Sequence, residues 1–303
     1  MRSARLTLGP ILFHWPKERK LDFYARIADE APIDTVYIGE VICSKRAPFF
    51  EEHYEEVASR LERGGKKVVL SSLCEVMLKR ERTMMKELTE IADRQIEVND
   101  ASGLLHISGR PHRLGPFMNV YNEATLKYLA DRGATHVCLP AELPRTAAAV
   151  LGQHAQSLGV GLEAQVYGRA SLAVSARCYH ARAHRRVKDN CQFVCEQDPD
   201  GMTLRTLSGQ DFLAINGIQT LSHACVNLLA DLPDIVGLGV GHLRLSPHTQ
   251  DMVATAAVFR DVLDGRIDSV EGNSRLLGLG PPGPFANGFW HGRAGHLFLT
   301  DQS

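Results

Sequence analysis

The chain has 303 residues, a length that one α/β barrel commonly reaches and that can bury a large core. Its 34 lysines and arginines nearly balance 35 aspartates and glutamates, so no overall field attracts a polyanion and nucleic-acid binding is not indicated. No apolar run is long enough for a membrane span, and the basic N-terminus has Pro10 and His14 within a short apolar stretch, so we expect no signal peptide. We therefore expect a cytoplasmic protein whose seven cysteines stay reduced.

Short β-branched runs alternate with longer amphipathic segments along the chain. The expected strands are 5–12, 35–42, 66–73, 95–100, 112–118, 135–140, 161–167 and 236–246. The expected helices include 48–65, 79–93, 122–133, 144–159 and 251–265. Asn122 suits a helix start, and Gly133 and Gly159 suit helix ends.

Eight strands alternating with helices predict one (β/α)8 TIM-like barrel domain over 1–303, with an open doubly wound sheet as the alternative. The segment 170–234 interrupts the repeat, and we interpret it as a long βα loop or insertion after the seventh strand. The last segment, 266–303, is expected to be a Gly/Pro-rich tail.

Five cysteines follow predicted strands, where the chemistry of a barrel gathers. Cys43 follows the second strand and Cys74 the third, while three more lie after the seventh: Cys178, Cys191 and Cys195. All five are thus predicted on one face. The other two are expected to be small buried hydrophobic residues, Cys138 inside the sixth strand and Cys225 in a helical pattern.

The three cysteines after the seventh strand have the spacing C-x12-C-x3-C within a basic segment. A disulfide conflicts with the expected reducing surroundings. Spacing alone does not decide among the three remaining interpretations, which are an iron–sulfur cluster, a zinc site completed by His180 and His184, and no metal at all. Five cations would lower the thiol pKa values and offset the charge of a cluster: Arg177, Arg182, Arg185, Arg186 and Lys188.

Other polar residues near predicted strand ends have two interpretations each. His14 and Trp15 could contact a ligand or form a packing pair, and packing is favoured. Glu40 and Glu163 could transfer protons or be structural acids paired with an arginine inside the barrel, and the structural role is slightly favoured.

Asn119 and Asn122 bracket Tyr121 after the fifth strand, where an amide could hold a substrate oxygen or, for Asn122, cap a helix. The sequence has no G-x-G-x-x-G after a strand, no P-loop and no H-E-x-x-H, so nucleotide and zinc-protease chemistry lack support.

The stretch "EAQVYGRASLAVSARCY", 163–179, resembles the signature of peptidase family U32, and 117–144 is similar to the strand, helix and strand that precede it. "LTLGPILFHWPKE", "DTVYIGEVICSKRAPF" and "ANGFWHGRAG" resemble the branch of this family that serves oxygen-independent ubiquinone biosynthesis. The resemblance covers nearly the whole chain. Gln165 and Tyr167 depart from the family signature, which leaves those two side chains without an implied role.

The resemblance implies a [4Fe–4S] cluster held by Cys43, Cys178, Cys191 and Cys195. It also implies a heterodimer with a second U32 protein, UbiU, that hydroxylates a prenylated aromatic quinone precursor without dioxygen. Prephenate as the oxygen source and a lipid-carrier protein are further expected partners, and no catalytic residue is implied. RNA modification and peptidase activity, both associated with the family, are the alternatives.

Overall fold

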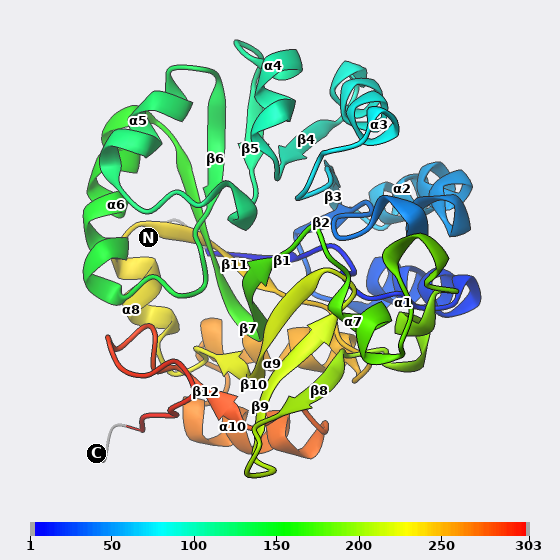
Figure 1. Cartoon of the computed structure of the whole chain (residues 1–303). Helices are drawn as coiled ribbons and strands as arrows, with labels where there is room; N and C mark the ends of the chain where they lie inside the picture. The colour runs from blue at the N-terminus through cyan, green and yellow to red at the C-terminus, as the bar shows by residue number, and fades with distance from the viewer. Residues whose placement is uncertain (1–3, 301–303) are drawn as a thin grey trace.

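The computed structural model describes residues 4–300; residues 1–3 of the basic N-terminus and 301–303 of the expected tail lie outside them. Eight parallel strands form a closed barrel in the order β1 to β7 and then β11, because β11 pairs with both β1 and β7 (Figure 1). The (β/α)8 prediction is confirmed and the open-sheet alternative is wrong. The barrel strands are β1 Arg5–Leu8, β2 Thr35–Ile38, β3 Lys67–Ser71, β4 Gln95–Val98, β5 His112–Leu114, β6 Ala134–Cys138, β7 Gly161–Val174 and β11 Val240–Leu245.

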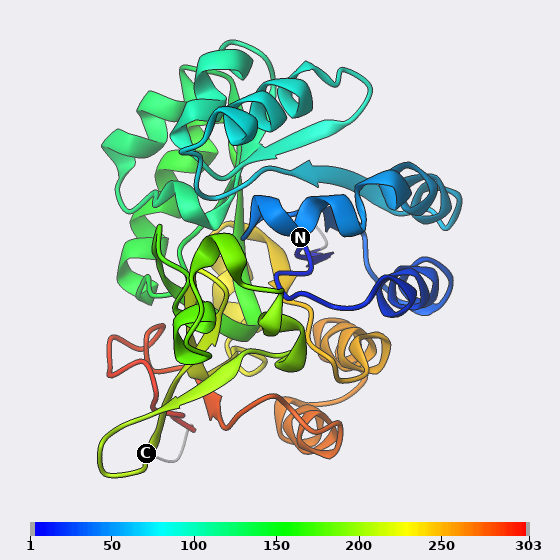
Figure 2. The same cartoon turned by 45° about the vertical axis from the view of Figure 1, so that its right-hand side comes forward.

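Helices follow the strands and cover the outside of the barrel (Figure 2). They are α1 Lys17–Glu30, α2 Tyr54–Arg63, α3 Lys79–Glu90, α4 Leu104–Ile107, α5 Glu123–Ala130, α6 Arg145–Leu158, α8 Leu232–Gly237, α9 Met252–Leu263 and α10 Ser269–Gly278. Buried apolar residues of the strands and helices form one continuous core, as parallel sheets covered on both faces require. None of the helices described is long and apolar enough to cross a membrane.

Helix boundaries follow the local signals in the sequence. The Asn122 side chain accepts a hydrogen bond from the Thr125 N–H at 2.8 Å and caps α5. Gly159 ends α6 with a φ of 68°, a left-handed conformation that glycine adopts without strain.

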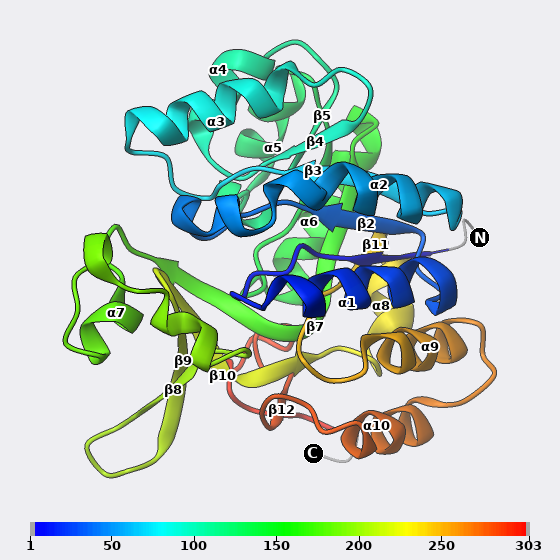
Figure 3. The same ribbon diagram turned by 90° about the vertical axis from the view of Figure 1, so that its right-hand side faces the viewer.

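The segment 170–234 contains strands and helices of its own and so forms an insertion, the second of the two expected possibilities. Strand β7 itself continues to Val174 and pairs with antiparallel β10 Gln219–Asn227, which pairs with β9 Asp211–Asn216, and β9 pairs with β8 Met202–Arg205. Figure 3 shows the β8–β9 hairpin and α7 Tyr179–Ala183 projecting to one side of the barrel. Cys225 therefore lies in strand β10 and not in a helix, although it is buried as expected.

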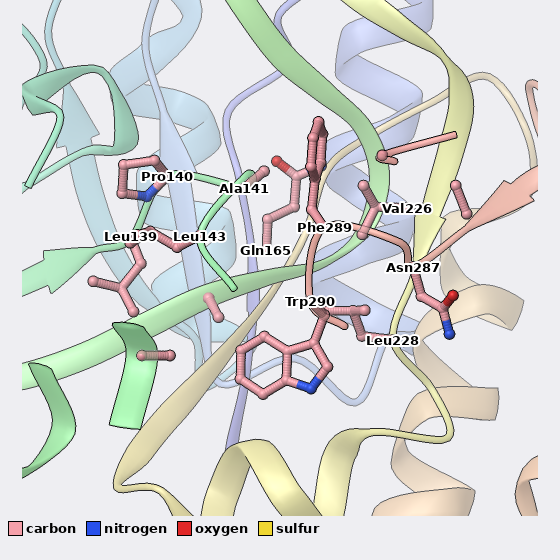
Figure 4. Close-up of a pocket in the computed structure, with 14 residues that line it drawn as sticks. Leu139, Pro140, Ala141, Leu143, Gln165, Val226, Leu228, Asn287, Phe289 and Trp290 are labelled. Atoms are coloured by element: carbon pink, nitrogen blue, oxygen red, sulfur yellow. The ribbon is translucent and has the colours of Figure 1, made fainter. Parts of the chain in front are cut away.

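The C-terminal segment 266–303 also differs from the prediction, because its first part forms helix α10. The rest packs on the barrel through β12 Phe285–Ala286, parallel to β10, and through buried Trp290. Figure 4 shows Phe289 and Trp290 of the tail closing a crevice beside Gln165. Its free volume is about 20 Å³, enough for little more than one water molecule, so the crevice is a packing feature.

Candidate functional site

A cavity of about 330 Å³ opens where the barrel strands end. This volume is within the range of small-molecule pockets, and the position is where barrel enzymes place their active sites. All eight barrel strands or the segments that follow them contribute to its lining, and β2 and β3 contribute one residue each, Val41 and Cys74. Further lining residues include Leu12, Glu97, Asn99, Phe117, Asn119, Tyr121, Glu142, Gln165, Arg169, Arg244 and Ser246.

The floor of this cavity is a buried network of charged residues. The Arg244 guanidinium donates to Glu97 at 2.5 Å and to Glu163 at 2.7 Å, and Tyr37 donates to the same Glu163 carboxylate at 2.8 Å. Burial alone would raise the pKa of Glu163, but Arg244 and His136 outweigh it and hold that pKa well below its usual range. Glu163 is therefore a structural acid paired with an arginine, as the sequence favoured.

Two polar atoms of this floor have no hydrogen-bond partner. Arg244 Nε and Asn99 Oδ1 are buried and unpaired, and both residues line the cavity. An unpaired buried polar group costs about 1–3 kcal/mol of stability, so a bound molecule whose polar groups pair with these two atoms would remove that cost. Neither residue had been singled out from the sequence, where they look like ordinary strand residues.

The other sequence candidates near the mouth have varied surroundings. Asn119 lines the cavity in a left-handed conformation with a φ of 53°, and Tyr121 lines it while donating to Glu142. Gln165 lines it too and donates to the Gly168 and Arg169 carbonyls. Tyr167 is fully buried against the core, so it has no access to a ligand.

His14, Trp15 and Glu40 have structural contacts. The His14 ring packs on Phe49 and Phe193, and Trp15 donates to the Pro199 carbonyl at 2.7 Å, so this pair holds the segment 170–234 against the barrel. Burial, with Arg46 and Lys20 nearby, lowers the pKa of His14 to about 4. The Glu40 carboxylate accepts the N–H groups of Ile42 and Cys43 at 3.1 and 3.0 Å and so fixes the turn that carries Cys43.

Two loops carry the four predicted cluster ligands. Cys43 follows β2, and the other three lie after β7 around α7 and the 3-10 segment Val194–Gln197. Electrostatic interactions link Cys43 with Cys195, and Cys178 with both Cys191 and Cys195. All seven thiols are free in the described part of the chain.

A small apolar cluster joins these thiols to the cavity. Val41, Ile42 and Ile218 form it, and both Cys43 and Cys178 pack against it. Other members of the same cluster line the cavity itself: Leu12, Val41, Cys74, Phe117 and Val174. Cys43 and Cys178 therefore border the mouth of the barrel.

Cys74 has different surroundings from the four predicted ligands. Burial raises the pKa of its thiol, and the charged groups that act on it are Glu75, Glu40 and Asp100, with no other cysteine among them. Burial also raises the pKa of Cys43, but there Arg46 opposes the effect. These surroundings agree with the sequence, in which no family motif marks Cys74.

The turn between Cys191 and Cys195 has an unusual backbone. Gln192 and Phe193 have φ values of 49° and 51°, and Arg185 has 55°, so three of the four non-glycine residues with positive φ in the described chain lie between Cys178 and Cys195. Such conformations cost of order 1–3 kcal/mol each and persist where surrounding contacts impose them.

A buried arginine, Arg46, is the cation that lies among the thiols. Electrostatic interactions link it with Cys195, Glu40 and Cys43. The basic run predicted for this role is largely at the surface, since Arg177, Arg182 and Arg185 are exposed. Arg46 belongs to the motif "GEVICSKR". It follows the polar residues Ser44 and Lys45, so the sequence does not indicate that Arg46 is buried.

The second metal-binding possibility from the sequence rests on His180 and His184. Among residues 4–300, one group brings three metal-binding atoms within 4.8 Å of each other, and it consists of His180, His184 and Asp198. The two rings are stacked with an interplanar angle of 13°, and His180 Nε2 lies 2.9 Å from Asp198. This hydrogen-bond contact connects the segments that carry Cys178 and Cys195.

The four cysteines do not form such a compact group in the described chain. A single zinc ion would require one, whereas the iron and sulfide atoms of a cubane cluster separate its four thiolates more widely. Four free thiols from two loops, next to a buried cation with an unpaired Nε, suit a tetrathiolate cluster. The [4Fe–4S] assignment stays a prediction.

Fold and site together define a (β/α)8-barrel protein with a cysteine-rich segment at its mouth. The chain belongs to peptidase family U32, whose model matches residues 23–295.

Two solved structures share weaker similarity. An uncharacterized protein from B. cereus has a TM-score of 0.37 at 15% identity over 57% of this chain and 50% of that one. Orotidine 5'-monophosphate decarboxylase from Methanocaldococcus jannaschii has a TM-score of 0.35 at 11% identity, covering 54% of this chain and 82% of that one. This chain therefore spans half the length of the first of them.

Proposed function

We propose that the chain is the iron–sulfur subunit of an oxygen-independent hydroxylase that acts on the prenylated aromatic ring in ubiquinone biosynthesis, in the manner of UbiV. The observation that supports this most is the apolar cluster that joins Cys43 and Cys178 to the barrel cavity. It puts a candidate redox group beside a pocket with room for an aromatic ring.

In this proposal Cys43, Cys178, Cys191 and Cys195 hold the cluster, which supplies one-electron transfer when bound. The chain's own residues bind and orient the substrate. Arg244 Nε–H donates to, and Asn99 Oδ1 accepts from, the polar groups of the bound molecule, because both atoms are otherwise unpaired. The apolar wall of Leu12, Val41 and Phe117 keeps water from the face nearest the thiols.

The partners of this reaction belong to the same proposal. A second U32 protein of the UbiU type forms the heterodimer, prephenate supplies the oxygen, and a lipid-carrier protein presents the hydrophobic precursor. The assignment of these partners rests on the resemblance of "GEVICSKR" and "NGFWHG" to this branch of the family.

Deleting the gene tests the proposal in cells grown with and without dioxygen. We expect the anaerobic deletion strain to lose ubiquinone and to accumulate an unhydroxylated prenylated precursor, while aerobic ubiquinone stays normal. Complementation with the Cys195→Ala variant should fail, and Cys225→Ala, which alters a buried cysteine in β10 away from the other thiols, should restore ubiquinone. Equal anaerobic ubiquinone in the deletion and parent strains would refute the proposal.

A further inference from the structure

Arg46 is a buried cation without a carboxylate partner. Its side chain is 1% exposed. One guanidinium nitrogen donates to the Leu12 carbonyl at 3.0 Å and another to the Asn216 side chain at 2.9 Å, while Nε has no partner. No ion pair with a carboxylate is found for Arg46 in the described part of the chain.

The surrounding charges do not balance within the protein alone. Lys20 is also buried, with its ammonium 5.1 Å from the Phe50 ring centroid. Glu40 is the acid that interacts with both cations, and its carboxylate already accepts two backbone N–H groups. Two buried cations against one carboxylate leave one excess positive charge, which is costly in a low-dielectric interior unless an anion compensates it.

The groups near Arg46 that would compensate its positive charge are cysteine sulfurs, as thiolate ligands of the proposed cluster. Cys195 and Cys43 interact electrostatically with the Arg46 guanidinium, and the Arg46 backbone N–H donates to the Cys43 carbonyl at 2.8 Å. Gly217 completes the cradle, because a Cβ at that position would approach Arg46 Nη2 to 2.8 Å. The guanidinium is thus held between the β2 loop, the β1 loop and the β9–β10 turn, next to two of the four thiols.

We propose that Arg46 is the buried counter-charge of the cysteine-bound cluster and that it raises the reduction potential of that cluster. The inference rests on the proposed function, since it requires the cluster. When the cluster accepts one electron from a donor, its charge becomes more negative by one unit. The protein itself supplies no electron in this step. A fixed cation near a ligand sulfur stabilises the more negative, reduced state more than the oxidised state. Arg46 acts through the cluster and is a positioning residue.

The test is a redox titration of protein purified without oxygen, with dithionite as reductant and electron paramagnetic resonance as readout. Arg46→Gln removes the charge and keeps a similar length, so we expect a midpoint potential more negative than in the wild type. Arg46→Lys keeps the charge and should recover most of the shift. Arg182→Gln removes an exposed cation on α7 and should leave the potential unchanged.

A second variant covers the case in which Arg46→Gln does not fold. Asn216→Asp puts a carboxylate against the Arg46 guanidinium and neutralises the cation in place, so it should also lower the potential. Iron-loaded Arg46→Gln or Asn216→Asp protein with an unchanged or more positive potential would overturn this inference alone. Wild-type protein that binds no iron would refute the proposed function.

Discussion

At the scale of single residues, the predicted ligands can be separated from the neighbouring cysteine by iron content. We expect Cys43→Ala, Cys178→Ala, Cys191→Ala and Cys195→Ala each to lose most of the iron and acid-labile sulfide of anaerobically purified protein, because each removes one thiolate. Cys74→Ala is the control, since Cys74 packs on the same apolar cluster but no family motif marks it. Iron lost from Cys74→Ala but kept in Cys43→Ala would show that the ligand assignment is wrong.

The buried acid of the barrel predicts a specific pH dependence. Arg244 and His136 hold the pKa of Glu163 well below its usual value, so its stabilisation is complete above the unfolded-state pKa of about 4.5 and is lost as the pH falls below it. Glu163→Gln should lower the free energy of unfolding by about 3–5 kcal/mol at pH 7.

Urea unfolding at several pH values measures this effect. The difference between the wild type and Glu163→Gln should shrink as the pH falls below about 4.5. Glu87→Gln, on the exposed face of α3, should change the free energy of unfolding by less than about 0.5 kcal/mol at every pH. A difference for Glu163→Gln that does not vary with pH would contradict the ionised pair.

At the scale of elements, the end of α6 shows how local conformation determines a boundary. Gly159 has a φ of 68° and no atom within 4 Å of an added Cβ, so Gly159→Ala adds backbone strain without a clash. We expect a loss of about 1–2 kcal/mol in the free energy of unfolding. Gly237→Ala at the end of α8 also meets no atom within 4 Å but has no positive φ, so urea unfolding should show no loss. Equal effects of the two variants would rule out the strain argument.

The segment 170–234 shows where local signals failed at the same scale. Its strands β8, β9 and β10 are stabilised by pairing with one another and with the extended β7, and these partners are distant along the chain. The pattern around Cys225 fits a helix as well as a strand, and tertiary pairing decided for the strand. The helix α10 was missed because its sequence stands next to the Gly/Pro-rich part of the tail.

At the scale of the whole molecule, the proposed heterodimer gives a test that does not depend on activity. Co-expression with a UbiU-type U32 protein should yield a stable 1:1 complex, because permanent hetero-interfaces are large and apolar. Size-exclusion chromatography with light scattering measures the stoichiometry, and an unrelated barrel protein is the control. A monodisperse monomer that ignores the U32 partner would contradict the heterodimer.

The sequence by itself determined the eight barrel strands, most of the helices between them and the order in which they alternate, because hydrophobic periodicity and capping residues act over a few neighbours. It also placed Cys43, Cys178, Cys191 and Cys195 after strands that end at the same mouth. Only the tertiary structure decided that β11 closes the barrel, that Arg244 and Asn99 have unpaired atoms in its cavity, and that Arg46 is the buried cation beside the thiols. These features depend on contacts between segments far apart in the chain, and neither burial nor the lack of a partner can be deduced from a residue's neighbours in sequence.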